Sequence, residues 1–181
     1  LKTESLSLDV ANGGCHVKIG VISDSHDRLE AISAAVDRFN AEGVQHVFHA
    51  GDIISPFTVS CFKPLRARLH IVWGNNDGDR LLLRERFGEI QALIHGNFMD
   101  LELGGRRIAM THGTEEAVVQ ALARCGGYDL VIRGHTHQPE IGKEGAALVV
   151  NPGDASGYLA GERTVAVVDL EAMEARLVTL P

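Results

Sequence analysis

The amino-acid sequence predicts an α/β fold of four layers, in which two mixed β-sheets face each other and helices cover both outer faces. Two observations support this prediction. From residue 17 to residue 87, apolar runs alternate with segments of helical periodicity, which is the pattern of parallel strands joined by helical crossovers. Further along the chain, short apolar runs are separated by turn residues, which indicates additional strands.

The first half begins with an apolar run at 17–22, which predicts a strand buried on both faces. Apolar residues then recur at helical spacing from Leu29 to Phe39, and Gly43 closes this helix. A second strand is expected at 47–50.

Ser55 as N-cap and Pro56 at the first helical position predict the next helix. A strand at 69–73 and a helix at 79–87 complete a βαβαβα pattern. This half of the chain is therefore expected to form parallel strands.

The second half changes character. We expect a hairpin at 98–113 that turns at its two central glycines, a helix at 115–125 and a strand at 129–133. After Pro139, three apolar runs joined by short turns predict three more strands. We expect this half to be antiparallel.

The length of 181 residues fits one domain, which we place at 17–181. Residues 1–16 form an N-terminal segment of uncertain order, without the pattern of a signal peptide. A formal net charge of −7 argues against an extended nucleic-acid surface, which depends on Lys and Arg. No apolar run is long enough for a membrane span.

The three cysteines, Cys15, Cys61 and Cys125, are widely spaced and form no C-x-x-C motif. They predict neither a disulfide framework nor a thiolate zinc site. A reducing, cytoplasmic setting is the simplest interpretation.

Polar side chains follow five of the expected strands. Because ligands of α/β sheets bind outside the carboxyl ends of the strands, these side chains are expected to meet at one rim. In chain order they are Asp24 and His26, then Asp52, then Asn75, Asn76 and Asp77, then His112, and finally His135 and His137.

Each motif has a simpler interpretation when it is taken alone. Asp24 could cap a helix, Asp52 could belong to a turn, His112 could be a hydrogen-bonded core residue, and the segment from His135 to His137 could be a polar surface turn. The recurrence at five successive strand ends favours a common site. The remaining histidines, without carboxylate neighbours in sequence, are interpreted as structural: His16, His46, His49, His70 and His95.

Carboxylate, imidazole and amide oxygen, without thiolate, are ligands of divalent metals such as Mn, Fe, Zn or Ni. Seven of the rim residues, all except Asn76 and Asp77, are counted as candidate ligands, and seven exceed the four that a tetrahedral ion needs. Two ions that share a carboxylate would use them all.

The motifs SDSH, GD, GNND, THG and GHTH resemble, in order and spacing, those of the calcineurin-like metallophosphoesterases, and in particular their small single-domain phosphodiesterase branch. The resemblance covers about residues 17–181 and implies an αββα sandwich with two metal ions. By motif position, the first ion would be held by Asp24, His26, Asp52 and His137. The second would be held by Asp52 as the bridge, Asn75, His112 and His135.

The resemblance also implies an activity, the hydrolysis of phosphodiesters by a hydroxide that bridges the two ions. Mn²⁺ is the expected metal, with Ni²⁺, Fe²⁺ and Zn²⁺ as alternatives. The expected partner is a small phosphate-ester substrate, and homo-oligomerisation stays open. The natural substrate is not identified by the sequence.

The chain departs from the family at two positions. Asn76 stands where many members have a histidine that protonates the leaving group, and an amide has no proton to give near neutral pH. We therefore expect Asn76 to bind a phosphoryl oxygen. Asp154 stands where serine is more common, with no predicted effect. Asp77 could orient a neighbour or act as a weak acid, and Arg133 could contact substrate or form an ion pair.

A non-catalytic alternative is a protein-binding scaffold on the same fold, as in the retromer complex. In the present chain all seven proposed metal positions carry side chains that can coordinate an ion. Ligand completeness therefore favours the enzyme.

Overall fold

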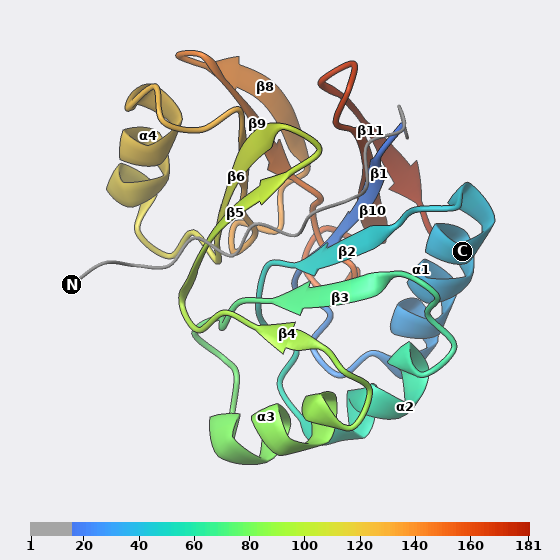
Figure 1. Ribbon diagram of the computed structural model, residues 1–181. Helices are drawn as coiled ribbons and strands as arrows, with labels where there is room; N and C mark the ends of the chain where they lie inside the picture. Colours follow the sequence, from blue (N-terminus) through green and yellow to red (C-terminus); the bar gives the residue numbers. More distant parts are fainter. Residues whose placement is uncertain (1–15) are drawn as a thin grey trace.

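The computed structural model describes residues 16–181 (Figure 1). The interpretation of residues 1–15 lies outside this range, as does Cys15. The strands are β1 (Lys18–Ile22), β2 (His46–His49), β3 (Arg68–Ile71), β4 (Leu93–Ile94), β5 (Phe98–Leu103), β6 (Arg106–Thr111), β7 (Leu130–Ile132), β8 (Glu140–Glu144), β9 (Ala147–Asn151), β10 (Thr164–Asp169) and β11 (Glu174–Thr179). The helices are α1 (Leu29–Glu42), α2 (Val59–Phe62), α3 (Arg80–Gly88) and α4 (Glu116–Arg124), with a 3-10 turn η1 (Pro56–Thr58) before α2.

Both sheets are mixed, as predicted. The first has the order β11-β10-β1-β2-β3-β4. Strands β1 to β4 are parallel, β10 is antiparallel to β1, and β11 is antiparallel to β10. The second has the order β5-β6-β7-β9-β8. The expected antiparallel second half is wrong for the centre of this sheet, because β6, β7 and β9 are parallel. The chain reverses direction between β7 and β8 and again between β8 and β9. Strand β9 is therefore antiparallel to β8 and parallel to β7.

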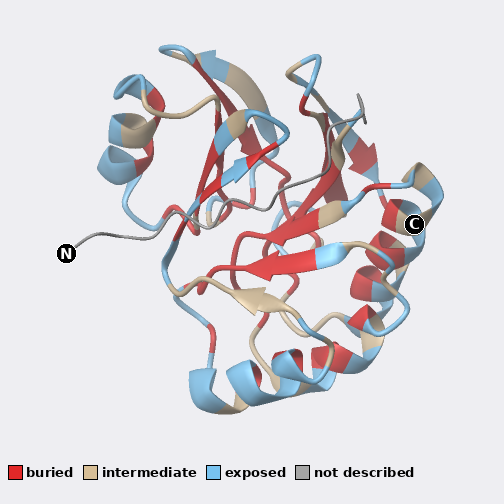
Figure 2. Cartoon of the chain, in the orientation of Figure 1, coloured by how far each residue is buried: buried red, intermediate tan, exposed pale blue. Residues whose placement is uncertain are grey.

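The four predicted layers are confirmed by three separate apolar clusters. Helices α1, α2 and α3 pack on the first sheet through a cluster that includes Ile32, Phe62 and Phe87. A second cluster fills the space between the sheets, and a third packs α4 on the second sheet through Val119 and Ala123. Figure 2 shows the same division, with buried residues on the strands and on the inner faces of the helices.

Two local predictions differ in detail. The helix expected after Ser55 is only η1 followed by the single turn of α2, and the Ser55 hydroxyl does not cap it. Instead this hydroxyl donates to Asp27 Oδ1 at 2.8 Å, which ties two loops of the rim together. Gly43 does close α1, in the left-handed conformation with φ 66°.

The strands β4 and β8 were missing from the sequence prediction. Strand β4 has two residues, and β8 (EIGKE) contains little apolar surface. Both lie at sheet edges, where only one neighbouring strand constrains the sequence. No helix among the described residues has the length and apolar character needed to span a membrane.

Candidate metal centre

The loops of the predicted site have unusual backbone geometry. Asp24, His26, Asp52, His135 and His137 adopt positive φ angles of 54°, 41°, 59°, 71° and 58°, respectively. Non-glycine residues seldom take this conformation because it costs free energy, and such residues concentrate at functional sites. The loops therefore hold these side chains in positions that a relaxed turn would not provide.

Glycines next to the site let these loops approach each other. A Cβ atom on Gly74 would lie 2.1 Å from Asp52 Oδ1, and one on Gly134 would lie 1.8 Å from Ser23 Oγ. Real Cβ atoms essentially never make such contacts, so the glycines of the GNND and GHTH motifs are required for the close approach of these loops.

Carboxylates and imidazoles converge at the rim in two groups. Asp24, His26 and His137 form one group of candidate ligands, and Asp24, Asp52 and His112 form the other. The two groups share Asp24, and Asp52 also lies close to a histidine of each group. Its Oδ2 atom lies 3.6 Å from His26 Nε2 and 3.5 Å from His112 Nε2. The simpler interpretations of Asp24 as a helix cap and of His137 as part of a surface turn are wrong, since both residues are buried at this rim.

The donor atoms fit a divalent cation. The Nδ1–H group of His112 donates to the carbonyl oxygen of Ala50 at 2.7 Å, so in a neutral ring the Nε2 lone pair faces Asp52 Oδ2. Two acceptors face each other there, which is stable only with a proton or a cation between them. Asp24 Oδ1, His26 Nε2 and His112 Nε2 are all buried without a hydrogen-bond partner. These unsatisfied atoms are suited to metal coordination.

The pKa values reflect this concentration of charge. Burial raises the pKa of Asp24 above its ordinary value. Burial acts in the same direction on Asp52, but interactions with His112 and Asn76 outweigh it and hold the pKa of Asp52 below its ordinary range. Burial lowers the pKa of His112, but Asp52 outweighs burial and the net pKa is raised. The rim therefore attracts positive charge.

His135 lies at the same rim but belongs to neither group of carboxylates and imidazoles among the described residues, and Asn75 follows β3 at that rim. Asn75 and His112 line a common cleft. The ring of His135 lies edge-on to that of His112, with 5.1 Å between the centroids. The backbone N–H of His135 donates to Asp24 Oδ2 at 3.0 Å. The structure thus brings both residues near the centre.

Asn76 contacts the central carboxylate. Its backbone N–H donates to Asp52 Oδ1 at 2.8 Å, and its side-chain amide donates to Asp52 Oδ2 at 2.7 Å. The amide nitrogen carries two hydrogens, so one N–H group stays free for another acceptor.

The roles of Asp77 and Arg133 were left open by the sequence. The Asp77 carboxylate accepts hydrogen bonds from four backbone N–H groups, those of Asp52, Ile53, Ile54 and Gly74. It fastens the loop after β2 to the loop after β3. Arg133 is buried and pairs with Glu116 from α4, so its guanidinium is structural.

Asp154, for which the sequence predicts no effect, is fully buried beside His137. One of its oxygens lies 3.0 Å from His137 Nδ1. The carboxylate also accepts hydrogen bonds from the Ser156 hydroxyl and from the backbone N–H groups of Gly157, Leu159 and Ala160. Burial raises the pKa of Asp154, but these hydrogen bonds outweigh burial and lower it to about 2. Asp154 is therefore a carboxylate that faces His137 from the side opposite Asp24.

The five other histidines lie outside both groups of candidate ligands. His46, His70 and His95 form a hydrogen-bonded chain across neighbouring strands, with N···N distances of 2.9 and 3.1 Å. His16 pairs with Asp169. His49 contacts Ser25 Oγ at 3.0 Å and so joins the SDSH loop to β2.

Comparison with known proteins agrees with this geometry. The family model of the calcineurin-like phosphoesterase superfamily domain matches residues 17–173. The phosphodiesterase MJ0936 of Methanocaldococcus jannaschii is 38% identical over 165 residues, which cover 91% of this chain and 99% of that protein.

Two solved structures have a similar fold. An archaeal phosphodiesterase superposes with a TM-score of 0.87 at 38% identity, and the match covers 91% of this chain and all of that one. Vps29 of Entamoeba histolytica, in complex with zinc, superposes with a TM-score of 0.58 at 21% identity, over 90% of this chain and 98% of its own. The second likeness concerns the fold alone. With its family motifs gathered at one rim and a family model matched over most of its length, the chain belongs to the calcineurin-like phosphoesterase superfamily, a family of hydrolases.

Proposed function

We propose that this chain, as a single domain over residues 17–181, is a phosphodiesterase that uses two divalent metal ions, with Mn²⁺ as the preferred ion. The observation that carries the proposal is the position of the Asp52 carboxylate between the unpaired Nε2 atoms of His26 and His112. The first ion would be held by Asp24, His26, Asp52 and His137, and the second by Asp52, Asn75, His112 and His135.

Divalent ions bound here would supply activation of a water molecule and neutralisation of the phosphoryl oxygens. The protein's own groups have complementary tasks. The free N–H of Asn76 can donate to a non-bridging phosphoryl oxygen, while its other N–H orients Asp52. The oxygens of Asp77 are occupied by four backbone N–H groups, so this carboxylate serves to join two loops of the site.

The absence of a general acid among these groups supports a preference for diesters with good leaving groups. General acid catalysis typically contributes about 10² to 10⁴ in rate, so alkyl leaving groups would depart slowly. The name of the archaeal relative, a phosphodiesterase, supports the same substrate class. The cysteine pattern supports a cytoplasmic setting.

The test is a metal and substrate screen. Protein purified without chelator is supplied with Mn²⁺, Ni²⁺, Fe²⁺ or Zn²⁺ and assayed on matched 4-nitrophenyl monoesters and diesters. We expect up to two ions per chain by elemental analysis and a higher kcat/KM for the diester. Asp52→Asn, with its fold verified by circular dichroism, should lose activity and at least one ion, because two dications at about 4 Å repel strongly without a charged bridge. A protein that binds no metal in excess Mn²⁺ would contradict the proposal.

The alternative is a protein-binding scaffold, and the likeness to Vps29 is the observation in its favour. A scaffold has no need for a buried set of unpaired ligand atoms held by strained loops. The screen separates the two functions, since a scaffold that binds metal would still turn over neither ester.

A further inference from the structure

A cleft of about 290 Å³ opens directly beside the metal centre. Asn75 and His112, two of the proposed ligands, form part of its lining. One wall is formed by the loop after β3 and the start of α3, and the other by the loop after β6 and the first turn of α4. An ester that is bound at the metal centre therefore has room for one of its arms in this cleft.

Among the residues that the structure describes, Arg80 is the only arginine or lysine that lines the cleft. Its guanidinium donates to the carbonyl oxygen of Gly74 at 2.8 Å and to Asn97 Oδ1 at 3.4 Å, and it lies 5.8 Å from the ring centroid of Trp73. Within the described part of the chain it has no carboxylate partner, in contrast to Arg86 on the same helix, which pairs with Glu89. A guanidinium has five N–H groups, so three stay available here.

The anchor of Arg80 fixes where its charge lies. Gly74 directly precedes the proposed ligand Asn75, and the bond to its carbonyl oxygen holds the guanidinium next to the metal-binding loop. Glu115 is the one carboxylate among the lining residues, and it belongs to the wall that leads into α4. The cleft therefore presents a fixed positive charge on one wall and a negative charge on the other.

We propose that this cleft receives one ester arm of the substrate, and that Arg80 selects arms that carry a second anionic group, either a carboxylate or a phosphate. This inference rests on the proposed phosphodiesterase function and adds the chemical class of the substrate arm. A guanidinium suits both groups because its planar N–H donors match their paired oxygens.

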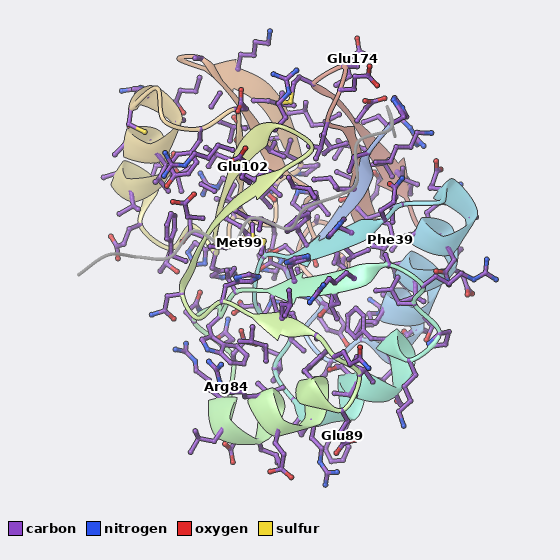
Figure 3. All side chains as sticks on the ribbon, viewed as in Figure 1. Phe39, Arg84, Glu89, Met99, Glu102 and Glu174 are labelled. Atoms are coloured by element: carbon purple, nitrogen blue, oxygen red, sulfur yellow. The ribbon has the colours of Figure 1, made fainter. Side chains whose placement is uncertain are left out.

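The test compares three 4-nitrophenyl phosphodiesters whose second arm is propyl, 2-carboxyethyl or 2-phosphoethyl. Wild-type protein with Mn²⁺ should favour the two anionic arms, mainly through a lower KM. Arg80→Gln should reduce the preference for these arms over propyl roughly tenfold, the size expected for a hydrogen bond to a charged group. Arg84→Gln removes the same charge from an exposed position of α3 outside the cleft (Figure 3) and should leave the preference unchanged. Glu115→Gln should increase it by removing a like charge.

Equilibrium binding gives a second readout that does not depend on turnover. Calorimetry with 2-carboxyethylphosphonate and propylphosphonate, which are not hydrolysed, should show the same preference in wild type and its loss in Arg80→Gln. Equal binding of the two phosphonates by wild type would overturn the proposal, even if no ester is hydrolysed and the proposed function itself fails.

Three kinetic outcomes would also overturn the proposal. The first is equal kcat/KM for all three arms in wild type, which would leave the phosphodiesterase function standing. The second is an equal loss for all arms in Arg80→Gln, which would mean that Arg80 only holds the Gly74 loop. The third requires a fourth ester with a 3-aminopropyl arm. A wild-type preference for this arm that disappears in Glu115→Gln would assign the cleft to cations.

Discussion

Asp154 illustrates how one buried carboxylate can act on a proposed metal ligand, His137. Its Oδ2 atom lies 3.0 Å from His137 Nδ1, which makes no well-aligned hydrogen bond with the described residues. The negative charge still favours a proton on this nitrogen, and His137 Nε2 is then unprotonated, 3.4 Å from Asp24 Oδ1. Such partners of ligating histidines typically change metal affinity by about 10- to 100-fold when they are removed. We therefore propose that Asp154 acts on the proposed metal centre through His137.

We predict that Asp154→Asn lowers the affinity for one of the two ions by about 10- to 100-fold. Titration calorimetry with Mn²⁺ measures the affinity, and the ¹⁵N shifts of the His137 ring in metal-free protein report the tautomer. Ser156→Ala is the matched control, because it removes one hydrogen bond of Asp154 without touching His137. If both variants weaken metal binding equally, Asp154 only holds the loop at 156–160.

Asn76 is the residue that we propose sets the preference between esters. Replacing it by histidine would place a group with a pKa near neutrality beside the leaving group. We predict that Asn76→His raises kcat/KM for aryl monoesters selectively. The value for diesters should fall because the hydrogen bond that the side-chain amide donates to Asp52 is lost. The check is the monoester-to-diester ratio of kcat/KM in both proteins. An unchanged ratio, in a wild type that already prefers monoesters, would contradict the leaving-group argument.

Strands β2 and β3, with the segment after β4, carry the chain of imidazoles from His46 through His70 to His95. A neutral imidazole has one N–H donor and one acceptor, so a row of neutral rings satisfies both bonds. Burial lowers the pKa of all three rings and brings that of His70 to about 3, against an ordinary value of 6.5. In the unfolded chain these rings take up protons near pH 6.5, while the folded protein resists protonation.

This difference predicts that stability falls on acidification. Between about pH 6.5 and pH 3 the unfolded state binds more protons than the native state, so the free energy of unfolding decreases as the pH is lowered. His70→Gln should flatten this dependence by up to about 1.4 kcal/mol per pH unit, the contribution of one proton. Urea unfolding at several pH values measures the slope. Parallel slopes for the variant and wild type would show that His70 is already protonated in the folded state.

The ligand-bearing loops belong to both sheets. Asp24, Asp52 and Asn75 follow strands of the first sheet, whereas His112 and His135 follow strands of the second. Bound ions would therefore connect the two halves of the molecule, and the unfolded chain does not hold these groups together. Metal binding should stabilise the fold by mass action.

We predict that Mn²⁺ at about 100 times its Kd adds roughly 2.7 kcal/mol of stability. For a domain of this size, that corresponds to a rise in Tm of roughly 5 to 10 °C. Calorimetric scans of chelator-treated protein with and without Mn²⁺ measure this rise. His112→Ala should keep the fold, since the apolar clusters are formed without it, but should show a smaller rise. Identical Tm values for wild type with and without Mn²⁺ would exclude a resident metal.

Local sequence patterns predict the features that depend on neighbouring residues. The alternation of apolar runs and helical spacing predicted the layers, and Gly43 predicted the end of α1. The polar residues at successive strand ends predicted that these side chains meet at one rim, because the carboxyl ends of parallel strands lie at the same edge of a sheet. The same local rules missed β4 and β8, whose edge positions impose little pattern on the sequence.

The partners of the buried polar groups depend on long-range packing, which local sequence patterns do not predict. The backbone of His135 bonds Asp24 across 111 residues, and Asp154, Asp77 and Arg133 obtained their roles from loops or helices distant in sequence. A carboxylate can act as acid, ligand, loop anchor or imidazole partner, and its sequence neighbours do not distinguish these roles. The burial of each group and the donors that surround it distinguish them, and both arise only when the two sheets pack together.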